Sequence, residues 1–319
     1  MGEFDLIQQY FSKPSQRADV SLSIGDDCAV TQIGANDTLA ITTDTLVCGT
    51  HFLPNISASD LAYKSVAVNL SDLAAMGASP AWISLALTLP KIQHNWLAEF
   101  SQSLFAILNR YHVDLIGGDT TQGHLSLTLT AQGILPKGKG LFRHKAQIGD
   151  WIFVSGTLGD SAAGLDLLLK NGNLSTESYR YLVQRHLRPT PRVELGLALN
   201  AFSCCAIDIS DGLLADLGHI LKKSQVGAEL YLEGLPLSQH LLSVYENQAE
   251  QFALTGGEDY ELCFTVSNDN REKMEQTLRS QGIKVTCIGK ITPSTSGLIL
   301  YKNHQIVPLP QQGGFDHFK

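Results

Sequence analysis

The chain has few features of a membrane, secreted or nucleic-acid-binding protein. No uncharged apolar run approaches the ~20 residues that a membrane-spanning helix needs, and the opening MGEFDLIQQYF is too acidic for a secretory leader. Lys and Arg number 23 against 31 Asp and Glu, which gives a net charge of −8, whereas a nucleic-acid-binding surface needs a basic stripe. These absences predict a cytoplasmic protein that binds neither membrane nor nucleic acid.

Several catalytic signatures are missing as well. The six cysteines form no C-x-x-C pair and no spacing of a secreted disulfide framework, so reduced thiols are expected. The chain has no G-x-x-x-x-G-K-[ST] motif, no G-x-G-x-x-G after an expected strand and no H-R-D kinase loop. The sequence shows no apparent Ser-His or Cys-His pair that would indicate a covalent nucleophile. Any phosphate chemistry must therefore use a different set of residues.

Length and pattern indicate two domains. The chain has 319 residues, of which 44% are hydrophobic and 17% are charged, as in an ordinary globular protein with room for two cores. Segments with strand and helix patterns alternate along it, which predicts an α/β or α+β fold. Residues 136–140, PKGKG, interrupt this alternation. We expect an N-terminal domain over residues 1–137 and a C-terminal α/β domain over residues 138–319.

Residues 62–80 are the stretch around which the N-terminal half is organised. Their apolar positions recur at helical spacing, and Ser57 and Asp60 precede them in the Ser-x-x-Asp form of a capping box. Ser65, Asn69 and Asp72 share one stripe of this helix. A carboxylate beside so much apolar surface needs a cation or several donors. Asp72 is therefore a candidate metal ligand, and the alternative is that it caps the helix end or lies on a solvated face.

The remaining pattern of the N-terminal half predicts further elements around this helix. We expect a short helix in residues 2–11, a helix over residues 95–111, and strands over residues 38–43, 83–90, 113–116 and 125–134. The last strand alternates strongly between apolar and polar residues, which gives it one solvated or partner-facing side. Its apolar face could be buried against a second copy of the chain.

Acidic residues recur beside Gly, Ser or Thr at the ends of short apolar runs. One such pattern is usually a turn, but here it occurs five times, and clustered carboxylates repel each other unless cations neutralise them. Carboxylate and hydroxyl oxygens suit Mg²⁺ or Mn²⁺ better than zinc. Bound Mg²⁺ in turn indicates phosphoryl or nucleotide chemistry. The five patterns contain Asp26 with Asp27, Asp44, Asp72, Asp119, and Asp208 with Asp211.

Three further features each allow two interpretations. The turn over residues 155–160, SGTLGD, precedes an expected helix and either offers amides to a phosphate or only joins a strand to a helix. Arg143 is either a phosphate clamp or an ordinary surface residue. His51 is either a general base or a packing and hydrogen-bonding residue.

The order of motifs along the chain resembles a known family. GEFDLI, GDDCA, TTDTL with HF, NLSDLAAMGA, GGDTT, DISDGL, GGEDYELCFT and the closing GFDHF are similar to those of the thiamine-monophosphate kinases. This family belongs to the superfamily of aminoimidazole-ribonucleotide synthetase and selenophosphate synthetase. The resemblance implies ATP-dependent phosphorylation of thiamine monophosphate to thiamine diphosphate, assisted by several Mg²⁺ ions. It also implies a homodimer in which the N-terminal domains form a shared β-barrel, with ATP bound nearby.

The resemblance also assigns residues. It implies no covalent or acid–base catalyst, because bound metals and positioning carry the reaction. Cys48, Thr50 and Lys145 depart from the family pattern, which affects only local geometry. The implied magnesium ligands are Asp27, Thr42, Thr43, Asp44, Asp72, Asp119, Asp208 and Asp211. The implied ATP-binding residues are Asp26, Gly118, Asp119, Arg143 and Ser210, and the implied acceptor-binding residues are His51, Glu258 and Phe315.

Two other functions compete with the kinase. One is a sister synthetase that uses ATP to activate an amide or a selenium species. A selenophosphate synthetase needs a reactive Cys near its N-terminus, and here none precedes Cys28. The other is a non-catalytic sensor of metal or nucleotide. For Phe315, contact with the acceptor competes with simple anchoring of the C-terminus.

Overall fold

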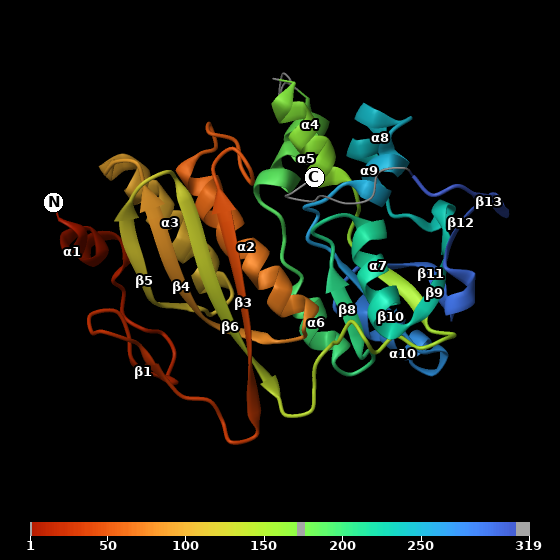
Figure 1. Ribbon diagram of the computed structural model, residues 1–319, viewed down its shortest axis with the longest axis horizontal. Coiled ribbons are helices and arrows are strands. Elements are labelled where there is room, and N and C mark those ends of the chain that lie inside the picture. The colour runs from red at the N-terminus through yellow and green to blue at the C-terminus, as the bar shows by residue number, and fades with distance from the viewer. Residues whose placement is uncertain (1, 171–175, 311–319) are drawn as a thin grey trace. The chain divides into compact units, whose positions relative to one another are not determined.

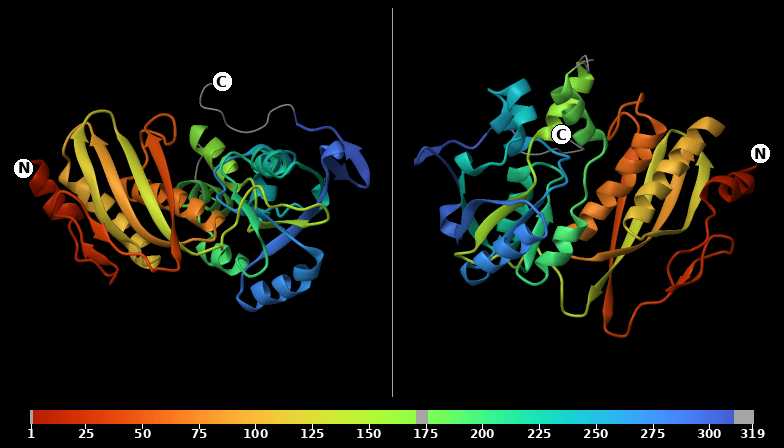
Figure 2. Two further views of the ribbon diagram at one scale, coloured as in Figure 1. Left: turned by 60° about the horizontal axis from the view of Figure 1, so that its bottom comes forward. Right: turned by 180° about the vertical axis from the view of Figure 1, so that it is seen from behind.

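The computed structural model describes residues 2–170 and 176–310 of the chain (Figures 1 and 2). The chain divides into two compact units, which we call unit 1 and unit 2. Unit 1 consists of Met1–Leu73 and Ala78–Lys139, and unit 2 consists of Ala74–Gly77 and Gly140–Lys319. Each unit has its own sheet and helices.

Unit 1 is built on a four-stranded sheet in the order β3-β6-β4-β5. The pairs β3–β6 and β4–β6 are antiparallel, whereas β4 and β5 are parallel. The helices α2 and α3 both lie on one face of this sheet (Figures 1 and 2). The elements of unit 1 are α1 (Glu3–Leu6), a π-helical turn (Ile7–Phe11), β1 (Val20–Leu22), β2 (Val30–Thr31), β3 (Asp37–Val47), α2 (Ala58–Ala75), β4 (Ser79–Leu89), α3 (His94–Arg110), β5 (Asp114–Gln122) and β6 (Ser126–Pro136).

The alternation of β6 places its apolar residues in the core of unit 1. Leu127, Leu129 and Ala131 are fully buried, and Leu73 of α2 comes close to Gly133 on the same strand. The expectation that this apolar face awaits a second copy is therefore wrong, because helices of the same unit cover it. The opposite face of the sheet carries polar residues and the exposed side chain of Ile41 on β3.

The central helix begins as predicted and ends earlier. The N–H of Asp60 donates to Ser57 Oγ at 3.0 Å, which confirms Ser57 as the N-cap, and Ser57 Oγ donates in turn to Asp60 Oδ2 at 2.7 Å. Gly77 has a φ of +69°, and the N–H of Ala78 donates back to Leu73 O at 2.9 Å. This glycine turn ends the helix, so Ser79 belongs to β4.

The segment Ala74–Gly77 belongs to unit 2. There Asn200 Nδ2 donates to Gly77 O at 2.8 Å. A side chain at Gly196 would place its Cβ 2.1 Å from Ala74 O, so only glycine allows this approach. Residues far downstream in the sequence thus hold the end of the helix.

Strand β5 is longer than predicted. Residues 117–121, GGDTT, lie inside the strand instead of after it. Gly118 adopts a φ of +153°, and a Cβ at this position would lie 1.9 Å from Leu85 O on β4. The glycine therefore lets β5 continue alongside β4 and carries Asp119 into the sheet.

Unit 2 is built on a seven-stranded sheet in the order β13-β12-β9-β11-β7-β10-β8. All neighbouring strands are antiparallel except β12 and β9. Its strands are β7 (Trp151–Ser155), β8 (Cys205–Asp208), β9 (Val226–Tyr231), β10 (Leu262–Val266), β11 (Val285–Pro293), β12 (Leu298–Lys302) and β13 (Gln305–Val307). Its helices are α4 (Asp160–Leu169), α5 (Glu177–Leu187), α6 (Val193–Leu199), α7 (Leu213–Ser224), α8 (Gln239–Tyr245), α9 (Ala249–Thr255) and α10 (Asn268–Ser280), with 3-10 turns at Leu232–Gly234 and Ser294–Ser296.

Helices cover both faces of the unit 2 sheet. Leu217 and Ile220 of α7 join a buried cluster with Ile152 and other strand residues. On the other face, the guanidinium of Arg271 on α10 lies 4.3 Å from the ring centre of Trp151. The predicted two-domain fold of mixed α and β structure is confirmed. Within the residues described here, no helix is long and apolar enough to cross a membrane.

Candidate active site

In unit 1, strand β3 and helix α2 each bring one acidic residue to the same place. Alternation along β3 turns Thr42 and Asp44 toward the helices, and Asp72 comes from the last turns of α2. The Thr42 hydroxyl donates to Asp72 Oδ2. Burial, and then the negative charge of Asp72, raises the pKa of Asp44 to about 6. The two carboxylates thus repel each other across a partly desolvated gap.

This arrangement fits the donor set of magnesium. Two carboxylates and a hydroxyl supply only oxygen, and a cation between Asp44 and Asp72 would remove their repulsion. Among the residues that the structure describes, no three or more His, Cys, Asp or Glu side chains form a complete metal cage. Mg²⁺ needs no such cage, since it usually keeps waters and binds one or two carboxylates plus substrate phosphates.

Two neighbouring predicted residues lie differently. Thr43 faces the opposite side of the sheet from Thr42, and its hydroxyl bonds with Thr130 Oγ1 on β6 at 3.0 Å. His51 follows β3, and its Nδ1 accepts the N–H of Val47 at 3.0 Å. This bond shows that His51 does have the hydrogen-bonding role expected as one alternative. Its contact with the acceptor stays a prediction.

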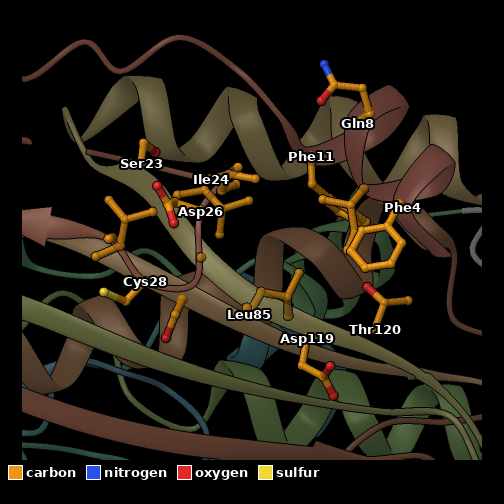
Figure 3. Close-up of a pocket in the computed structure, with 18 of the residues that line it drawn as sticks. Phe4, Gln8, Phe11, Ser23, Ile24, Asp26, Cys28, Leu85, Asp119 and Thr120 are labelled. Carbon is orange, nitrogen blue, oxygen red and sulfur yellow. The ribbon is translucent and has the colours of Figure 1, made fainter. Parts of the chain in front are cut away.

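A pocket of about 920 Å³ in unit 1 collects four other predicted residues (Figure 3). Asp26 and Asp27 reach it from the loop after β1, and Gly118 and Asp119 reach it from β5. In the close-up, Asp26 and Asp119 lie on different walls, with Phe4 beside Thr120 at the far end. The pocket therefore has both acidic and apolar lining residues, and small-molecule sites in general combine apolar walls with a few polar groups.

The apolar part of this pocket was not predicted as a site. Phe4 and Phe11 from the N-terminal helical segment line it together with Leu85 and Leu115. The two phenylalanines are seven residues apart, which is two helical turns, so their shared face was readable in the sequence. Within the acidic part, Asp26 Oδ1 accepts the N–H of Asp27 at 2.8 Å.

In unit 2, the loop after β8 carries the second group of predicted ligands. Asp208 ends the strand and is buried, and Ser210 and Asp211 follow it. The N–H groups of Ser210, Asp211 and Gly212 all donate to Asp216 Oδ2, at 3.0, 3.0 and 3.1 Å. Burial raises the pKa of Asp216 to about 7 against the lowering effect of these donors. A single side chain of α7 thus fixes the loop.

Arg143 lies within electrostatic reach of this loop. Its positive charge acts on Asp216 and lowers the pKa of that carboxyl, against the larger effect of burial. The backbone at Arg143 is held because Ser224 Oγ on α7 donates to Arg143 O at 2.8 Å. The positive charge of Arg143 thus acts on the carboxyl that holds the loop.

The predicted acceptor residue Glu258 is a direct neighbour of the same loop. Strands β8 and β10 pair antiparallel, with Asp208 opposite Leu262. Just beyond the pairing, the N–H of Glu258 donates to Ser210 O at 2.7 Å. Glu258 has a φ of +65° and Tyr260 a φ of +52°, and non-glycine residues held in this region cluster at functional sites.

Two acids of the GGEDYEL motif have roles that the sequence did not predict. Asp259 is buried and accepts the N–H groups of Gly159 at 2.6 Å and Ser161 at 3.1 Å. These amides open α4, so Asp259 caps the helix where a phosphate would otherwise bind. The structural interpretation of the SGTLGD turn is therefore the correct one.

Glu261 is the second of these acids and is also fully buried. It bonds to Arg185 Nη2 at 2.7 Å, to Arg192 Nε at 2.6 Å and to Ser155 Oγ at 2.6 Å. Burial alone would raise the pKa of Glu261, but the charge and hydrogen bond of Arg192, the charge of Arg185 and the hydrogen bond of Ser155 hold it below its usual value. Phe315, the last predicted acceptor residue, lies outside the described residues.

Known proteins resemble this chain in both of its units. Residues 25–135 match the family model "AIR synthase related protein, N-terminal domain", and residues 147–301 match the corresponding C-terminal domain. The thiamine-monophosphate kinase of Haemophilus influenzae is 56% identical over 323 residues, which cover 100% of this chain and 98% of the relative.

Solved structures show the same likeness. Thiamine-monophosphate kinase from Stenotrophomonas maltophilia superposes with a TM-score of 0.85 at 46% identity, covering 92% of this chain and 93% of that one. AaThiL complexed with AMPPCP and TMP superposes with a TM-score of 0.79 at 32% identity, covering 93% of each chain. Sequence and fold both agree over nearly the full length, and the chain therefore belongs to the thiamine-monophosphate kinase family.

Proposed function

We propose that this protein transfers the γ-phosphoryl group of ATP to thiamine monophosphate, giving thiamine diphosphate and ADP. The observation that carries the proposal is the likeness to AaThiL, which was solved with AMPPCP, an ATP analogue, and TMP in one complex. The chain covers 93% of that structure. Thiamine diphosphate biosynthesis is the corresponding process.

We assign the metal, ATP and acceptor sites to the residues that the family motif implies. Asp27, Thr42, Thr43, Asp44, Asp72, Asp119, Asp208 and Asp211 would hold several Mg²⁺ ions. ATP would contact Asp26, Gly118, Asp119, Arg143 and Ser210, and the acceptor would contact His51, Glu258 and Phe315. Three observations support this assignment, namely the facing pair Asp44 and Asp72, the acidic pocket and the bond between Glu258 and Ser210.

The chemistry is in-line phosphoryl transfer. A phosphate oxygen of thiamine monophosphate forms a bond to the γ-phosphorus of ATP, the bond to the β,γ-bridging oxygen breaks, and ADP leaves. The attacking oxygen is already ionised near neutral pH, so no strong base is needed. Bound Mg²⁺ supplies charge neutralisation between the two anions.

The chain's own residues position the two substrates. Arg143 binds phosphate oxygens through its planar guanidinium, and Gly118 contributes only backbone to the ATP site, since a Cβ at this position would meet Leu85 O on β4. Glu258 attracts the thiazolium cation of the acceptor. Positioning of this kind supplies much of the rate in phosphoryl transfer.

We also propose a homodimer in which two N-terminal domains, residues 1–137, share a β-barrel and bind metal and ATP, with residues 138–319 as the C-terminal α/β domain. The polar outer face of the unit 1 sheet, with the exposed Ile41, supports such pairing. The cytoplasm is the proposed location, since all six cysteines are free thiols.

An ADP-release assay with and without thiamine monophosphate tests the proposed function. We expect ADP release that depends on both the acceptor and Mg²⁺. Release that ignores the acceptor would favour a sister synthetase instead. No release under any condition would favour a non-catalytic sensor.

Direct transfer predicts that no phosphoenzyme forms. The protein is incubated with γ-labelled ATP and Mg²⁺ without acceptor, then separated from the nucleotide. We expect no stable label on the protein, because the acids act as metal ligands. Two serine–histidine contacts do occur, Ser161 with His186 and Ser178 with His240, but neither serine belongs to the proposed ATP site. Label that appears on the protein and moves to product when acceptor is added would contradict direct transfer.

A further inference from the structure

A buried histidine lies behind the proposed acceptor residue. His186 on α5 is only 3% exposed. Its Nδ1 lies 3.4 Å from Glu258 Oε2 and 3.2 Å from Ser161 Oγ. The Glu258 side chain is 28% exposed, so the histidine contacts its carboxylate from the protein interior.

The ring of His186 is held in a rigid frame. Helix α5 lies so close to α4 that a Cβ at Gly164 would be 2.1 Å from Leu182 O and 3.1 Å from His186 Cβ. The preceding residue, Arg185, is anchored on the buried Glu261 at 2.7 Å. Ser161 is fixed in turn because its N–H donates to Asp259. The imidazole therefore has little freedom to move away from Glu258.

The ring nitrogen that faces the carboxylate is Nδ1, the same atom that contacts Ser161 Oγ. An ionised carboxylate only accepts hydrogen bonds, so a hydrogen bond from His186 to Glu258 requires the proton on Nδ1. In that case Ser161 Oγ accepts a hydrogen bond from the same N–H. Both contacts are made by Nδ1, and the one to the partly exposed Glu258 carboxylate points toward the proposed acceptor site.

We infer that His186 is a positioning residue for the acceptor. Its Nδ1–H donates to the Glu258 carboxylate and fixes the direction in which that carboxylate meets the thiazolium cation of thiamine monophosphate. Glu258 already sits on a backbone with a φ of +65°, and the histidine supplies the second constraint, on the side chain. The inference rests on the proposed function, since it gives Glu258 its role at the acceptor.

The first test compares two substitutions of the histidine. His186→Leu keeps much of the volume and removes the donor, whereas His186→Asn keeps a donor near the position of Nδ1. For His186→Leu we expect the KM for thiamine monophosphate, and its Kd by calorimetry, to rise on the order of tenfold, as for loss of a hydrogen bond to a charged group. His186→Asn should restore most of the affinity. The KM for ATP should change less than twofold in both.

A double-mutant cycle shows whether the histidine acts through the glutamate. Glu258→Gln alone should also raise the acceptor KM. Adding His186→Leu to Glu258→Gln should then raise it no further than about twofold, because coupled residues are not additive. If the two effects instead multiply, His186 acts independently of Glu258 and the inference is wrong.

Two controls keep folding apart from positioning. His240→Leu is the matched variant, since the His240 ring also bonds to a serine, Ser178 Oγ at 3.1 Å, and stacks on Tyr181. It should leave the acceptor KM unchanged. If His186→Leu melts early, Ser161→Ala removes the other partner of the ring with little loss of volume and should raise the acceptor KM a few-fold.

The outcomes separate this inference from the proposed function. An inactive wild-type protein that also fails to bind thiamine monophosphate would reject the proposed function itself. A wild-type protein that phosphorylates the acceptor, with an unchanged acceptor KM in both His186→Leu and Ser161→Ala, would reject the role of His186 alone.

Discussion

Buried and half-buried acids in this chain fall into two kinds. Asp216, Asp259 and Glu261 are held by backbone N–H groups or arginines of the same unit. Asp44 and Asp72 instead face each other, and burial together with the charge of Asp72 raises the pKa of Asp44 to about 6. The first kind maintains local structure, whereas the second kind calls for a cation. Counting acids in the sequence does not distinguish these kinds.

At the scale of single residues, Asp72→Asn should nearly abolish phosphoryl transfer with the fold intact. The substitution removes one of two facing charges and weakens metal binding, and electrostatic groups of this kind are worth on the order of 10²–10³ in rate. Steady-state assays at saturating Mg²⁺ measure the loss. Asp60→Asn is the control, because Asp60 lies on the same helix at its capped start and should keep full activity. Activity of Asp72→Asn within tenfold of wild type would remove Asp72 from the metal site.

A second prediction concerns pH and the buried Glu261. Its pKa lies below the ordinary 4.5 in the folded state. A carboxylate of this kind stabilises the fold fully above its unfolded pKa and loses that contribution as the pH falls through the folded value. Glu261→Gln should therefore cost about 3–5 kcal/mol at pH 7, because it leaves two arginines without their carboxylate. The difference from wild type should shrink below pH 4.5.

Denaturant unfolding at pH 7 and at acid pH measures this window. Glu275→Gln is the matched control, since Glu275 pairs with Arg271 at 3.1 Å on the surface of α10, where both side chains are 33% exposed. An exposed pair is worth less than about 1 kcal/mol, so this variant should follow wild type. A constant difference between Glu261→Gln and wild type at all pH values would contradict the ion-pair explanation.

At the scale of elements, the start of α7 controls the loop that carries Asp211. Asp216→Asn replaces an oxygen that accepts three N–H groups with an amide that accepts less well. We expect the Mg²⁺ concentration for half-maximal activity to rise at least about tenfold, as for partners that orient metal ligands. Asp166→Asn on α4, whose carboxylate bonds to Tyr245 and Lys170, is the control. An unchanged Mg²⁺ dependence in a folded Asp216→Asn would show that the loop holds its shape without this acid.

Elements with strong local signals were predictable, and those set by distant contacts were not. The capping box of α2 and the period of α3 were readable from neighbouring residues. The extension of β5 was not, because it depends on how Gly118 approaches Leu85 O on another strand. In the same way, Asp259 caps α4 although it lies 100 residues away along the chain. No local sequence pattern in either segment predicts this contact.

The candidate site follows the same division. The acidic candidate residues could be identified from the sequence, and the order of its motifs indicated the family. Thr42 and Thr43 were predicted as ligands together, although alternation along a strand places neighbouring residues on opposite faces of the sheet. His186 could not be identified from the sequence, because no motif surrounds it. Its proposed role depends on the packing of α5 against α4.

At the scale of the whole molecule, the chain should form a homodimer of twice its 34.6 kDa mass. The outer face of the unit 1 sheet carries Ile41, which is 62% exposed. Ile41→Lys places a charge on this face and should yield monomers in sedimentation at micromolar concentration. Ile148→Lys, at a residue of unit 2 that is 63% exposed, is the matched control and should stay dimeric. A wild-type protein that sediments as an active monomer would contradict the proposed dimer.

The way the end of α2 is held has a consequence for the order of synthesis. Gly77 accepts its bond from Asn200, which is 123 residues further along the chain. At about 5–20 residues per second, a ribosome needs roughly 6–25 s to add that stretch. During this interval the end of α2 lacks the downstream residues that it contacts in the folded protein. Slowing translation between these two positions should therefore prolong the period in which a chaperone can bind the growing chain there.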